Sequence, residues 1–272
     1  MTDPGPDMTP PVVLTIAGVD PSGGAGLAAD LATFSTLGTH GTCAVTALTA
    51  QNTTGVHDVS ATDPSFVDAQ LAAVLDDLPV AAVKTGFLGR EAIIRAVLRW
   101  AVEGRLPNLV VDPVLVATDG MRLMDPGAEA AYRDLLRHAR VATPNLAEAA
   151  VLLGTELGSM DDVAPLAGQL AALGPEVVVV TGGQLSGDAT DLVITPGGAE
   201  PMAADRLDTH NVHGSGCTFA AATAARLAHG DDPPDAVHAA KVFVHRQLTM
   251  SAAWRLGAGT SGPVAHVEPP DR

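Results

Sequence analysis

The sequence predicts a single α/β domain in which helices cover both faces of a mostly parallel sheet. Short apolar runs rich in β-branched residues alternate with amphipathic helical patterns, which is typical of a parallel sheet joined by crossover helices. The 272 residues are 47% hydrophobic, enough for one large core, and with 3% aromatic residues that core must be mainly Ala, Val and Leu. No repeat or internal linker divides the chain, so we expect one domain over residues 12–253.

The composition excludes several classes of partner. The formal net charge of -16 at pH 7 repels polyphosphate backbones, and aromatic residues that could stack on bases are few, so we expect no nucleic-acid partner. No apolar run reaches membrane-spanning length. Residues 1–11 are predicted to be a disordered leader and residues 254–272 a loose C-terminal tail. Cys43 and Cys217 lack a metal-like spacing, which favours a reduced, cytoplasmic setting.

The first strand is expected at residues 12–17, and it leads through a glycine-rich loop (18–26) into a helix at 27–37. This loop could be mistaken for a dinucleotide-binding fingerprint, but its spacing does not match Gly-x-Gly-x-x-Gly. Its aspartate, Asp20, would also repel a pyrophosphate. We therefore expect Asp20 and the loop backbone to face a polar, neutral ligand, with a plain strand-to-helix connection as the alternative.

The remaining elements follow from the same two patterns. Strands are expected at residues 42–50, 56–61, 80–86, 109–114, 141–143 and 177–180, with a late, partly antiparallel pair at 189–195 and 202–207. Helices are expected at residues 64–78, 90–102, 129–140, 161–173, 219–227 and 234–253, and residues 117–122 are a candidate flap.

Polar residues stand near the carboxyl ends of several of these strands, where open parallel sheets bind their ligands. Gln51 carries both a donor and an acceptor and could recognise the edge of a heterocycle, although an ordinary turn residue is the alternative. Lys84 and Asp112 stand near the ends of their strands. They therefore indicate the same edge of the sheet as the ligand site.

Asn145 and Glu148 follow the strand at residues 141–143, three residues apart. On a helix this spacing places both side chains on one face, where they could hold Mg²⁺ through water. The structural alternative is an Asn that caps the helix, with an acid at the third helical position.

Residues 213–218 (HGSGCT) precede an Ala-rich helix and place glycines at its start. Backbone N–H groups at a helix start lack intrahelical partners, so a phosphoryl oxygen could be cradled by the amides of Gly214, Ser215, Gly216 and Cys217. The same field would favour the thiolate of Cys217, which makes it a candidate base or nucleophile. The alternative is a glycine turn capped by Ser215, with Cys217 as a small core residue.

Three segments together resemble the hydroxymethylpyrimidine and phosphomethylpyrimidine kinases of thiamine biosynthesis, which are members of the ribokinase-like superfamily. These segments are residues 15–26 (TIAGVDPSGGAG), 46–52 (TALTAQN) and 213–218 (HGSGCT). Supporting pieces occur in the family's order at residues 83–86, 111–114, 143–149 and 181–183. The resemblance therefore spans about residues 12–250.

The resemblance implies a three-layer α/β/α ribokinase-like kinase domain that transfers a phosphoryl group from ATP, with Mg²⁺, to the pyrimidine's hydroxymethyl group and then to the monophosphate. By position, the pyrimidine would be contacted by Gly18, Asp20, Gln51 and Lys84. The nucleotide would be bound by Asn145, Thr181 and Gly183, and Mg²⁺ by Glu148 and Asp112. The anion hole would consist of Gly214, Ser215 and Gly216. Cys217 would replace the Asp base of the superfamily's sugar kinases.

Some positions depart from the family pattern. Val19 stands where a Ser is usual, Phe87 replaces a common Met, and Gln184 stands where many members have His. Two alternatives follow, namely a pyridoxal or pyridoxine kinase and a non-catalytic pyrimidine sensor. The family resemblance also makes a homodimer possible.

Overall fold

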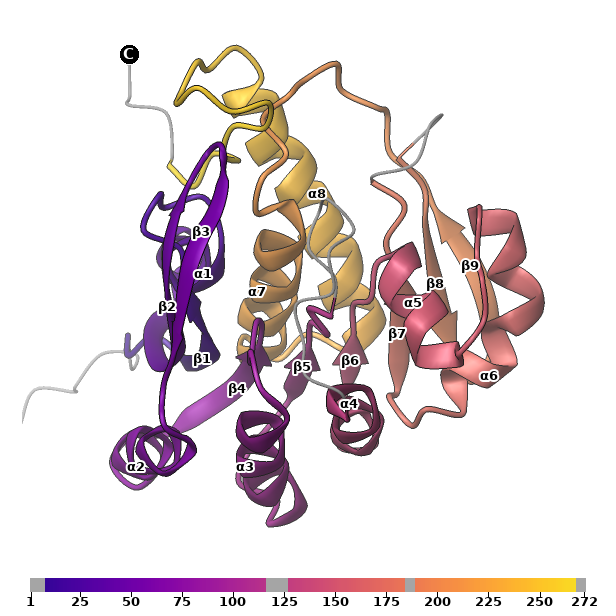
Figure 1. Cartoon of the computed structure of the whole chain (residues 1–272). Helices are drawn as coiled ribbons and strands as arrows, with labels where there is room; N and C mark the ends of the chain where they lie inside the picture. The colour runs from indigo at the N-terminus through magenta and orange to yellow at the C-terminus, as the bar shows by residue number, and fades with distance from the viewer. Residues whose placement is uncertain (1–7, 116–126, 184–188, 268–272) are drawn as a thin grey trace, which may run out of the picture.

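The computed structural model describes residues 8–115, 127–183 and 189–267 (Figure 1). Within these residues, one nine-stranded sheet has the order β3-β2-β1-β4-β5-β6-β7-β8-β9. Its strands are β1 (Val12–Val19), β2 (His40–Asn52), β3 (Gly55–Ala61), β4 (Val80–Thr85), β5 (Leu109–Val111), β6 (Val141–Ala142), β7 (Val177–Val180), β8 (Asp191–Thr195) and β9 (Gly198–Met202).

The sheet is parallel through its centre and antiparallel at both edges. Strands β2, β1, β4, β5, β6 and β7 run parallel, whereas β3 pairs antiparallel with β2, and β8 and β9 continue antiparallel beyond β7. The helices are α1 (Gly26–Thr36), α2 (Pro64–Leu75), α3 (Glu91–Val102), α4 (Ala128–Leu136), α5 (Leu146–Leu153), α6 (Ala167–Ala171), α7 (Ser215–Ala228) and α8 (Pro233–Ser251).

The helices form two outer layers, because successive residues of a strand point to opposite faces of the sheet. Val13 of β1 packs into a core with Phe34 of α1 and Phe219 of α7. Its neighbour Leu14 packs into the other core, with Ile93 of α3. The predicted three-layer α/β/α fold with a mostly parallel sheet is thus confirmed.

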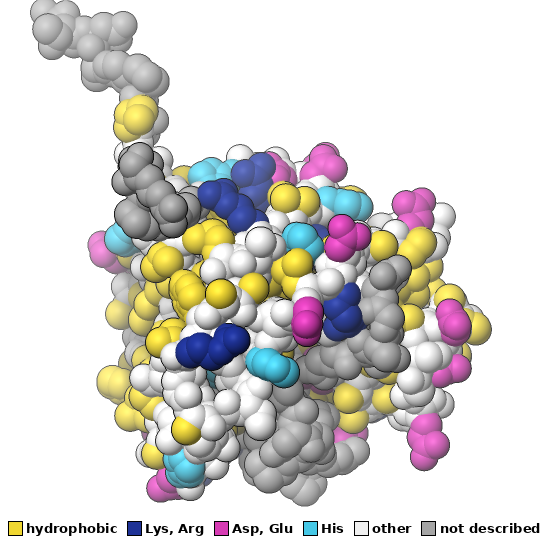
Figure 2. Space-filling model, turned by 90° about the horizontal axis from the view of Figure 1, so that it is seen from above, with side chains coloured by type: hydrophobic (Ala, Val, Ile, Leu, Met, Phe, Trp, Pro, Cys, Tyr) yellow, Lys and Arg dark blue, Asp and Glu magenta, His cyan; other side chains and the backbone are white. Residues whose placement is uncertain are grey.

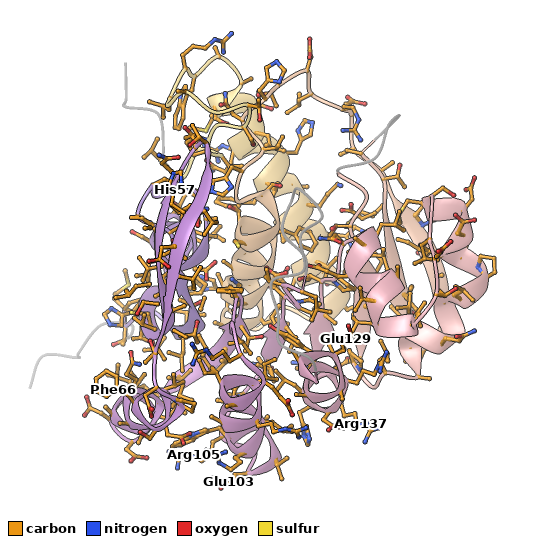
Figure 3. All side chains as sticks on the ribbon, viewed as in Figure 1. His57, Phe66, Glu103, Arg105, Glu129 and Arg137 are labelled. Atoms are coloured by element: carbon orange, nitrogen blue, oxygen red, sulfur yellow. The ribbon has the colours of Figure 1, made fainter. Side chains whose placement is uncertain are left out.

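Outside these two cores, polar and charged side chains project from the outer helices (Figure 3). Arg105, just beyond α3, pairs with Asp76 and stacks over the ring of Trp100, 5.0 Å from its centroid. Phe66 of α2 is 62% exposed. No helix in the described ranges is long and apolar enough to cross a membrane.

Two predicted elements are wrong in their boundaries. The last strand is β9, not residues 202–207, because Pro196 and Gly197 form a two-residue turn that starts the return strand earlier. The helix predicted at residues 161–173 is broken into two 3-10 turns and the short α6, in a segment that contains Pro165 and Gly168. The candidate flap at 117–122 lies outside the described residues, as do residues 1–7 of the leader.

Within the predicted loose C-terminal tail, residues 262–266 pack against the domain. Val264 and Ala265 are 1% and 0% exposed, and Thr36 Oγ1 donates a hydrogen bond of 3.0 Å to the carbonyl of His266. A short apolar group inside a polar segment was enough to pack this part of the chain against the domain. In Figure 1 the yellow loop before it lies beside the tip of the β2–β3 hairpin.

Candidate active site

The predicted site residues lie at one edge of the sheet, because the parallel strands all end there. Helix α7 also starts at this edge and runs down the sheet from it (Figure 1). Seen from above, this side carries Lys, Arg and His side chains among Asp and Glu (Figure 2). The acidity of the whole chain therefore does not give this face a single charge.

The start of α7 is a turn that only glycine allows. Gly214 caps the helix with φ +83, and a Cβ there would collide with the carbonyl oxygen of Gly24. Ser215 N–H donates to the Val212 carbonyl at 3.1 Å, so that amide is already engaged. Within the described chain, the amides of Gly216 and Cys217 have no backbone acceptor outside the helix. These two amides are the ones that could receive an anion.

Cys217 is half-buried where α7 and α1 both begin. Burial raises the pKa of its thiol to about 12, although the nearby Lys84 ammonium and a hydrogen bond from the Gly26 N–H both oppose this. The prediction of a favoured thiolate is therefore wrong for the protein without ligands. Loss of hydration outweighs the field of the helix start.

Lys84 is fully buried and forms an ion pair with Asp30 of α1, with Nζ 2.9 and 3.0 Å from the two carboxylate oxygens. Thr15 donates a further hydrogen bond of 2.6 Å to Asp30. A Cβ on Gly86 would lie 2.6 Å from Nζ, so this glycine leaves space for the ammonium. Burial lowers the pKa of Lys84, but the Asp30 carboxylate, together with the charges of Cys217 and Asp112, outweighs this effect and keeps the pKa above its usual value.

Asp30 is a site-related residue that the sequence reasoning missed. It lies on α1 among the buried positions Leu27 and Phe34, where an unpaired carboxylate would be very costly. Asp30 on the apolar face of a helix and Lys84 within a buried strand are opposite charges at positions where the sequence pattern predicts apolar residues. That pairing was the signal that could have identified Asp30.

Asp112 and Glu148 are two buried acids, 6% and 3% exposed. Burial raises the pKa of Asp112 to about 6, and burial together with the charge of Asp112 raises the pKa of Glu148 well above its usual value. The hydroxyls of Thr85 and Thr143, which end or follow the strands on either side of Asp112, are buried without a partner among the described residues. Buried acids beside unpaired hydroxyls fit Mg²⁺, which needs only one or two carboxylates when phosphates complete its shell.

Asn145 and Glu148 form the capping box that was the structural alternative. Asn145 Oδ1 accepts from the Glu148 N–H, and Glu148 Oε2 accepts from the Asn145 N–H, both at 2.9 Å. Glu148 Oε1 also accepts from the Leu115 N–H at 3.4 Å. No group of three or more His, Cys, Asp or Glu side chains within the described ranges is arranged to hold a metal.

Thr181 and Gly183 follow β7, beside the capping box. Thr181 pairs with Asn145 in an isolated parallel bridge, and its N–H donates to the Pro144 carbonyl at 2.9 Å. Among the described residues nothing lies within 4 Å of a Cβ on Gly183, whereas its carbonyl already accepts a hydrogen bond of 3.1 Å from Arg206. Asp191, which sequence reasoning missed, steadies this loop, because it accepts from the Gly182 N–H and pairs with Lys241 at 2.7 Å.

We expected Asp20 to face a polar ligand, and in the described structure its carboxylate is engaged by the protein's own groups. It is 5% exposed and accepts hydrogen bonds from the N–H groups of Ser22 and Ala25 and from His213 Nε2 at 2.8 Å. Burial raises the pKa of Asp20, but the hydrogen bonds from His213 and Ser22 outweigh burial and lower it. The carboxylate therefore ties the glycine-rich loop to the start of α7.

Gly18 and Gln51 lie on the neighbouring strands β1 and β2, and Gly18 lies beside the ring of Phe87. A Cβ on Gly18 would lie 3.1 Å from that ring. Gln51 is half-exposed, and its Oε1 lies 3.2 Å from Thr49 Oγ1, whose hydroxyl also donates to the Val19 carbonyl at 2.9 Å. Gln184 lies outside the described residues.

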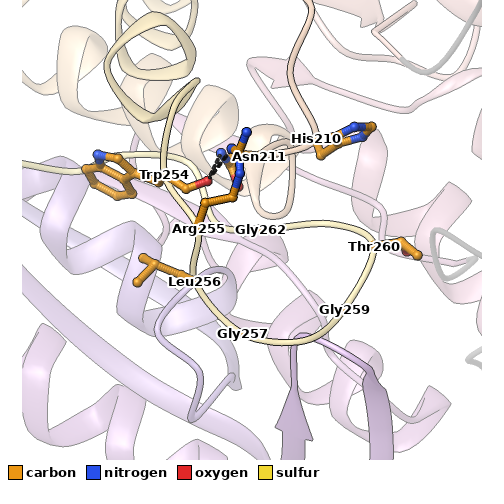
Figure 4. Close-up of a pocket in the computed structure, with 9 residues that line it drawn as sticks. All are labelled: His210, Asn211, Trp254, Arg255, Leu256, Gly257, Gly259, Thr260 and Gly262. Carbon is orange, nitrogen blue, oxygen red and sulfur yellow. Dashed lines mark hydrogen bonds between the residues drawn. The ribbon is translucent and has the colours of Figure 1, made fainter.

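A separate cavity of about 530 Å³ lies between His210, Asn211 and the loop of residues 254–262 (Figure 4). Asn211 Nδ2 donates to the Ser251 and Trp254 carbonyls at 2.6 and 3.2 Å and so holds this loop. None of the predicted site residues lines this cavity.

A three-layer α/β/α fold in which the glycine-capped helix α7 starts at the same sheet edge as two buried acids is typical of a ribokinase-like small-molecule kinase. The model of the family described as phosphomethylpyrimidine kinase matches residues 20–265. The chain belongs to this family. The match includes most of the segment predicted to be a loose tail.

Individual relatives agree with this assignment. The hydroxymethylpyrimidine/phosphomethylpyrimidine kinase of Streptomyces coelicolor is 44% identical over 98% of both chains. An ADP complex of Bacillus subtilis pyridoxal kinase has a TM-score of 0.86 at 37% identity and covers 95% of this chain and 98% of its own. Phosphomethylpyrimidine kinase from Clostridium difficile has a TM-score of 0.77 at 34% identity, with 87% and 98% covered.

Proposed function

We propose that this protein phosphorylates 4-amino-5-hydroxymethyl-2-methylpyrimidine and then its monophosphate, using ATP and Mg²⁺, in thiamine biosynthesis. The observation that carries the proposal is the similarity to a kinase of that name over 98% of both chains. The half-buried Cys217 at the anion-binding start of α7 supports it. A cytoplasmic location and a homodimer stay predictions.

The chain's own groups divide the work of phosphoryl transfer, which needs alignment and charge neutralisation more than covalent chemistry. The Gly216 and Cys217 amides bind phosphoryl oxygens at the helix start. Asp112 and Glu148 would hold Mg²⁺, which neutralises phosphate charge when bound. Thr181 and Gly183 would line the nucleotide site beside Asn145.

Cys217 takes the proton of the attacking hydroxymethyl group. Because burial raises the pKa of its thiol to about 12, the thiol must first release its own proton to solvent water, and the thiolate then accepts the proton of the hydroxymethyl group. The Lys84 ammonium and the Gly26 N–H favour the charged form. Cys217 therefore works as a base only where these groups, and the bound substrate, compensate for lost hydration.

The pyrimidine would lie against Gly18 and Phe87, with Gln51 at its ring edge. A pyridoxal kinase is the second candidate, since the Bacillus subtilis structure of that name has the same fold at 37% identity. Pyridoxal also carries a hydroxymethyl group, so the chemistry of transfer would be the same. Asp20 would act in either case through His213 and the loop backbone.

The test is Mg²⁺- and ATP-dependent ADP release with hydroxymethylpyrimidine, its monophosphate and pyridoxal in parallel. Turnover of the first two compounds is expected. Turnover of pyridoxal alone would assign the protein to vitamin B6 salvage. Tight binding of the pyrimidine without ADP release from any of the three would instead support a sensor.

Replacing Cys217 by Ala should lower kcat by about 10²- to 10⁴-fold, the usual contribution of a positioned base, while ATP affinity stays unchanged. Cys43→Ala is the matched control, because it removes the chain's other cysteine from strand β2. Steady-state kinetics and nucleotide titration measure the two effects. Normal turnover in the Cys217 variant would remove it from the mechanism.

A further inference from the structure

Residues 257–266, here called the C-terminal strap, run from the tip of the β2–β3 hairpin to the start of α7. At the hairpin end, Thr53 Oγ1 accepts hydrogen bonds of 3.2 Å from the N–H groups of Ala258 and Gly259. A Cβ on Gly257 or on Gly259 would collide with Thr53. The strap is therefore seated closely on a residue that lies only two positions beyond Gln51.

At its other end the strap holds the residue before the anion-binding turn. His213 N–H donates to the Gly262 carbonyl at 3.0 Å, and the Val264 N–H donates to the His213 carbonyl at 3.2 Å. The ring of His213 reaches Asp20 on the opposite side. The strap, the turn and the glycine-rich loop are thus joined through His213.

His266 makes the strap's last contact, directly inside the first turn of α7. Its Nε2 lies 2.8 Å from Thr218 Oγ1. Thr218 in turn bonds the Gly214 carbonyl twice, through its hydroxyl at 2.9 Å and its N–H at 2.8 Å. Because the hydroxyl's single proton goes to Gly214, the imidazole must be the donor to Thr218. Burial lowers the pKa of His266 to about 4, so the ring is neutral at pH 7, and the contact with Thr218 places its one proton on Nε2.

We propose that His266 is a positioning residue for phosphoryl transfer, which fixes the anion-binding turn through Thr218 and Gly214 while the strap anchors that turn to the β2–β3 hairpin. The proposal rests on the proposed function, because it concerns the same transfer. Gly214 sets the direction of the amides that follow it, so a small rotation of this turn moves the Gly216 and Cys217 N–H groups. Misplacement by about 1 Å can cost roughly 100-fold in rate.

The test compares His266→Ala with His266→Gln and His229→Ala. His229 is the matched control, because it caps the other end of α7, where its Nε2 lies 2.8 Å from the Leu37 carbonyl. We expect His266→Ala to lower kcat by about 10- to 100-fold with little change in the KM of the pyrimidine. Gln supplies an N–H donor and should restore part of the loss, and His229→Ala should keep normal turnover.

Turnover is expressed per folded site, counted by the stoichiometry of adenosine binding, so that loss of folded protein does not count as loss of rate. A kcat per site in His266→Ala equal to that of the unaltered protein would overturn the proposal. An equal loss in His229→Ala would overturn it as well, because the effect would then be general to α7.

Nucleotide binding separates failure of this proposal from failure of the proposed function. ADP carries phosphates to the anion-binding turn, whereas adenosine does not. His266→Ala should weaken ADP binding several-fold and leave adenosine binding unchanged. If the unaltered protein turns over none of the three substrates, the proposed function fails. The proposal for His266 is then tested by the ADP and adenosine titrations alone, and an unchanged ADP affinity in His266→Ala overturns it.

Discussion

The site contains two buried charge clusters that differ in one respect. Lys84 and Asp30 are both 0% exposed and pair with each other at 2.9 Å, so each charge has an opposite partner within the fold, although burial still raises the pKa of Asp30. Asp112 and Glu148 are also buried, but they carry like charges and each gains protons more readily than usual. The first cluster is complete without a ligand. The second needs a cation or protons, as expected of a site that binds its metal together with a substrate.

The two clusters are close enough to influence each other. The Lys84 ammonium lowers the pKa of Asp112, while the charge of Asp30 raises it. Since Asp30 already neutralises Lys84, little positive charge is left for Asp112. The Asp30–Lys84 pair therefore stabilises the fold and contributes to the electrostatic field at Cys217. The charges of Asp112 and Glu148 are left to be neutralised by a bound cation or by protons.

The largest effect that would break this comparison is expected from Lys84→Met. Removing the ammonium leaves the Asp30 carboxylate buried without a partner, which costs about 3–5 kcal/mol of unfolding free energy. Urea denaturation of the variant and of the unaltered protein measures this loss of unfolding free energy. Arg95→Met is the control, because Arg95 and Glu91 form an exposed pair whose loss should cost at most about 1 kcal/mol. Similar midpoints for both variants would show that burial does not distinguish these ion pairs.

Much of the fold could be predicted because local pattern and long-range topology agree. Runs such as residues 177–180, four valines, can only be buried strands in this context, and their alternation with helices sets a parallel sheet. The same topology brought Asp112 and Thr181 to one edge, since parallel strands end together. Position at a strand end was thus enough to select most of the candidate site.

The rest depended on contacts between distant residues. The Lys84–Asp30 pair joins residues 54 positions apart, and His266 contacts Thr218 across 48 positions. Neither spacing follows from a local motif. The protonation of Cys217 also depends on how much water the fold removes, and a helix start alone cannot fix that balance.

The pH dependence of stability would sharpen the comparison next. The pKa of Asp112 is raised from 3.8 to about 6, so the folded protein binds this proton more tightly than the unfolded chain. Its contribution is present below about pH 4 and is lost as the pH rises through 6, by at most about 3 kcal/mol. His266 has the opposite sign, because its lowered pKa costs stability below pH 6.5. The difference between the unaltered protein and Asp112→Asn isolates the carboxyl, and a difference that does not vary with pH would contradict the prediction.

Mg²⁺ should supply the charge that the second cluster lacks. With ADP present, Mg²⁺ at about 100 times its Kd should stabilise the protein by about 2.7 kcal/mol, since it binds only the folded state. Thermal unfolding with Mg²⁺ or with EDTA measures the shift. Asp112→Asn should lose most of it, whereas Asp68→Asn, which alters an acid that bonds Arg99 and Trp100 on the outer layer, should keep it. An equal shift in both variants would place the metal elsewhere.

The smallest effect is expected at Asn145, which caps the helix that carries Glu148 and is also predicted to contact the nucleotide. Asn145→Ala removes the helix cap and should cost about 1 kcal/mol, whereas Asn145→Ser keeps a capping oxygen and should restore most of that stability. If Asn145 only caps the helix, Ser restores turnover together with stability. If its amide also contacts the phosphates, the Ser variant is stable but slow, because the shorter side chain cannot reach them. Urea denaturation and kcat, measured on both variants, therefore tell whether the capping box only builds the acid cluster or also works beside it in transfer.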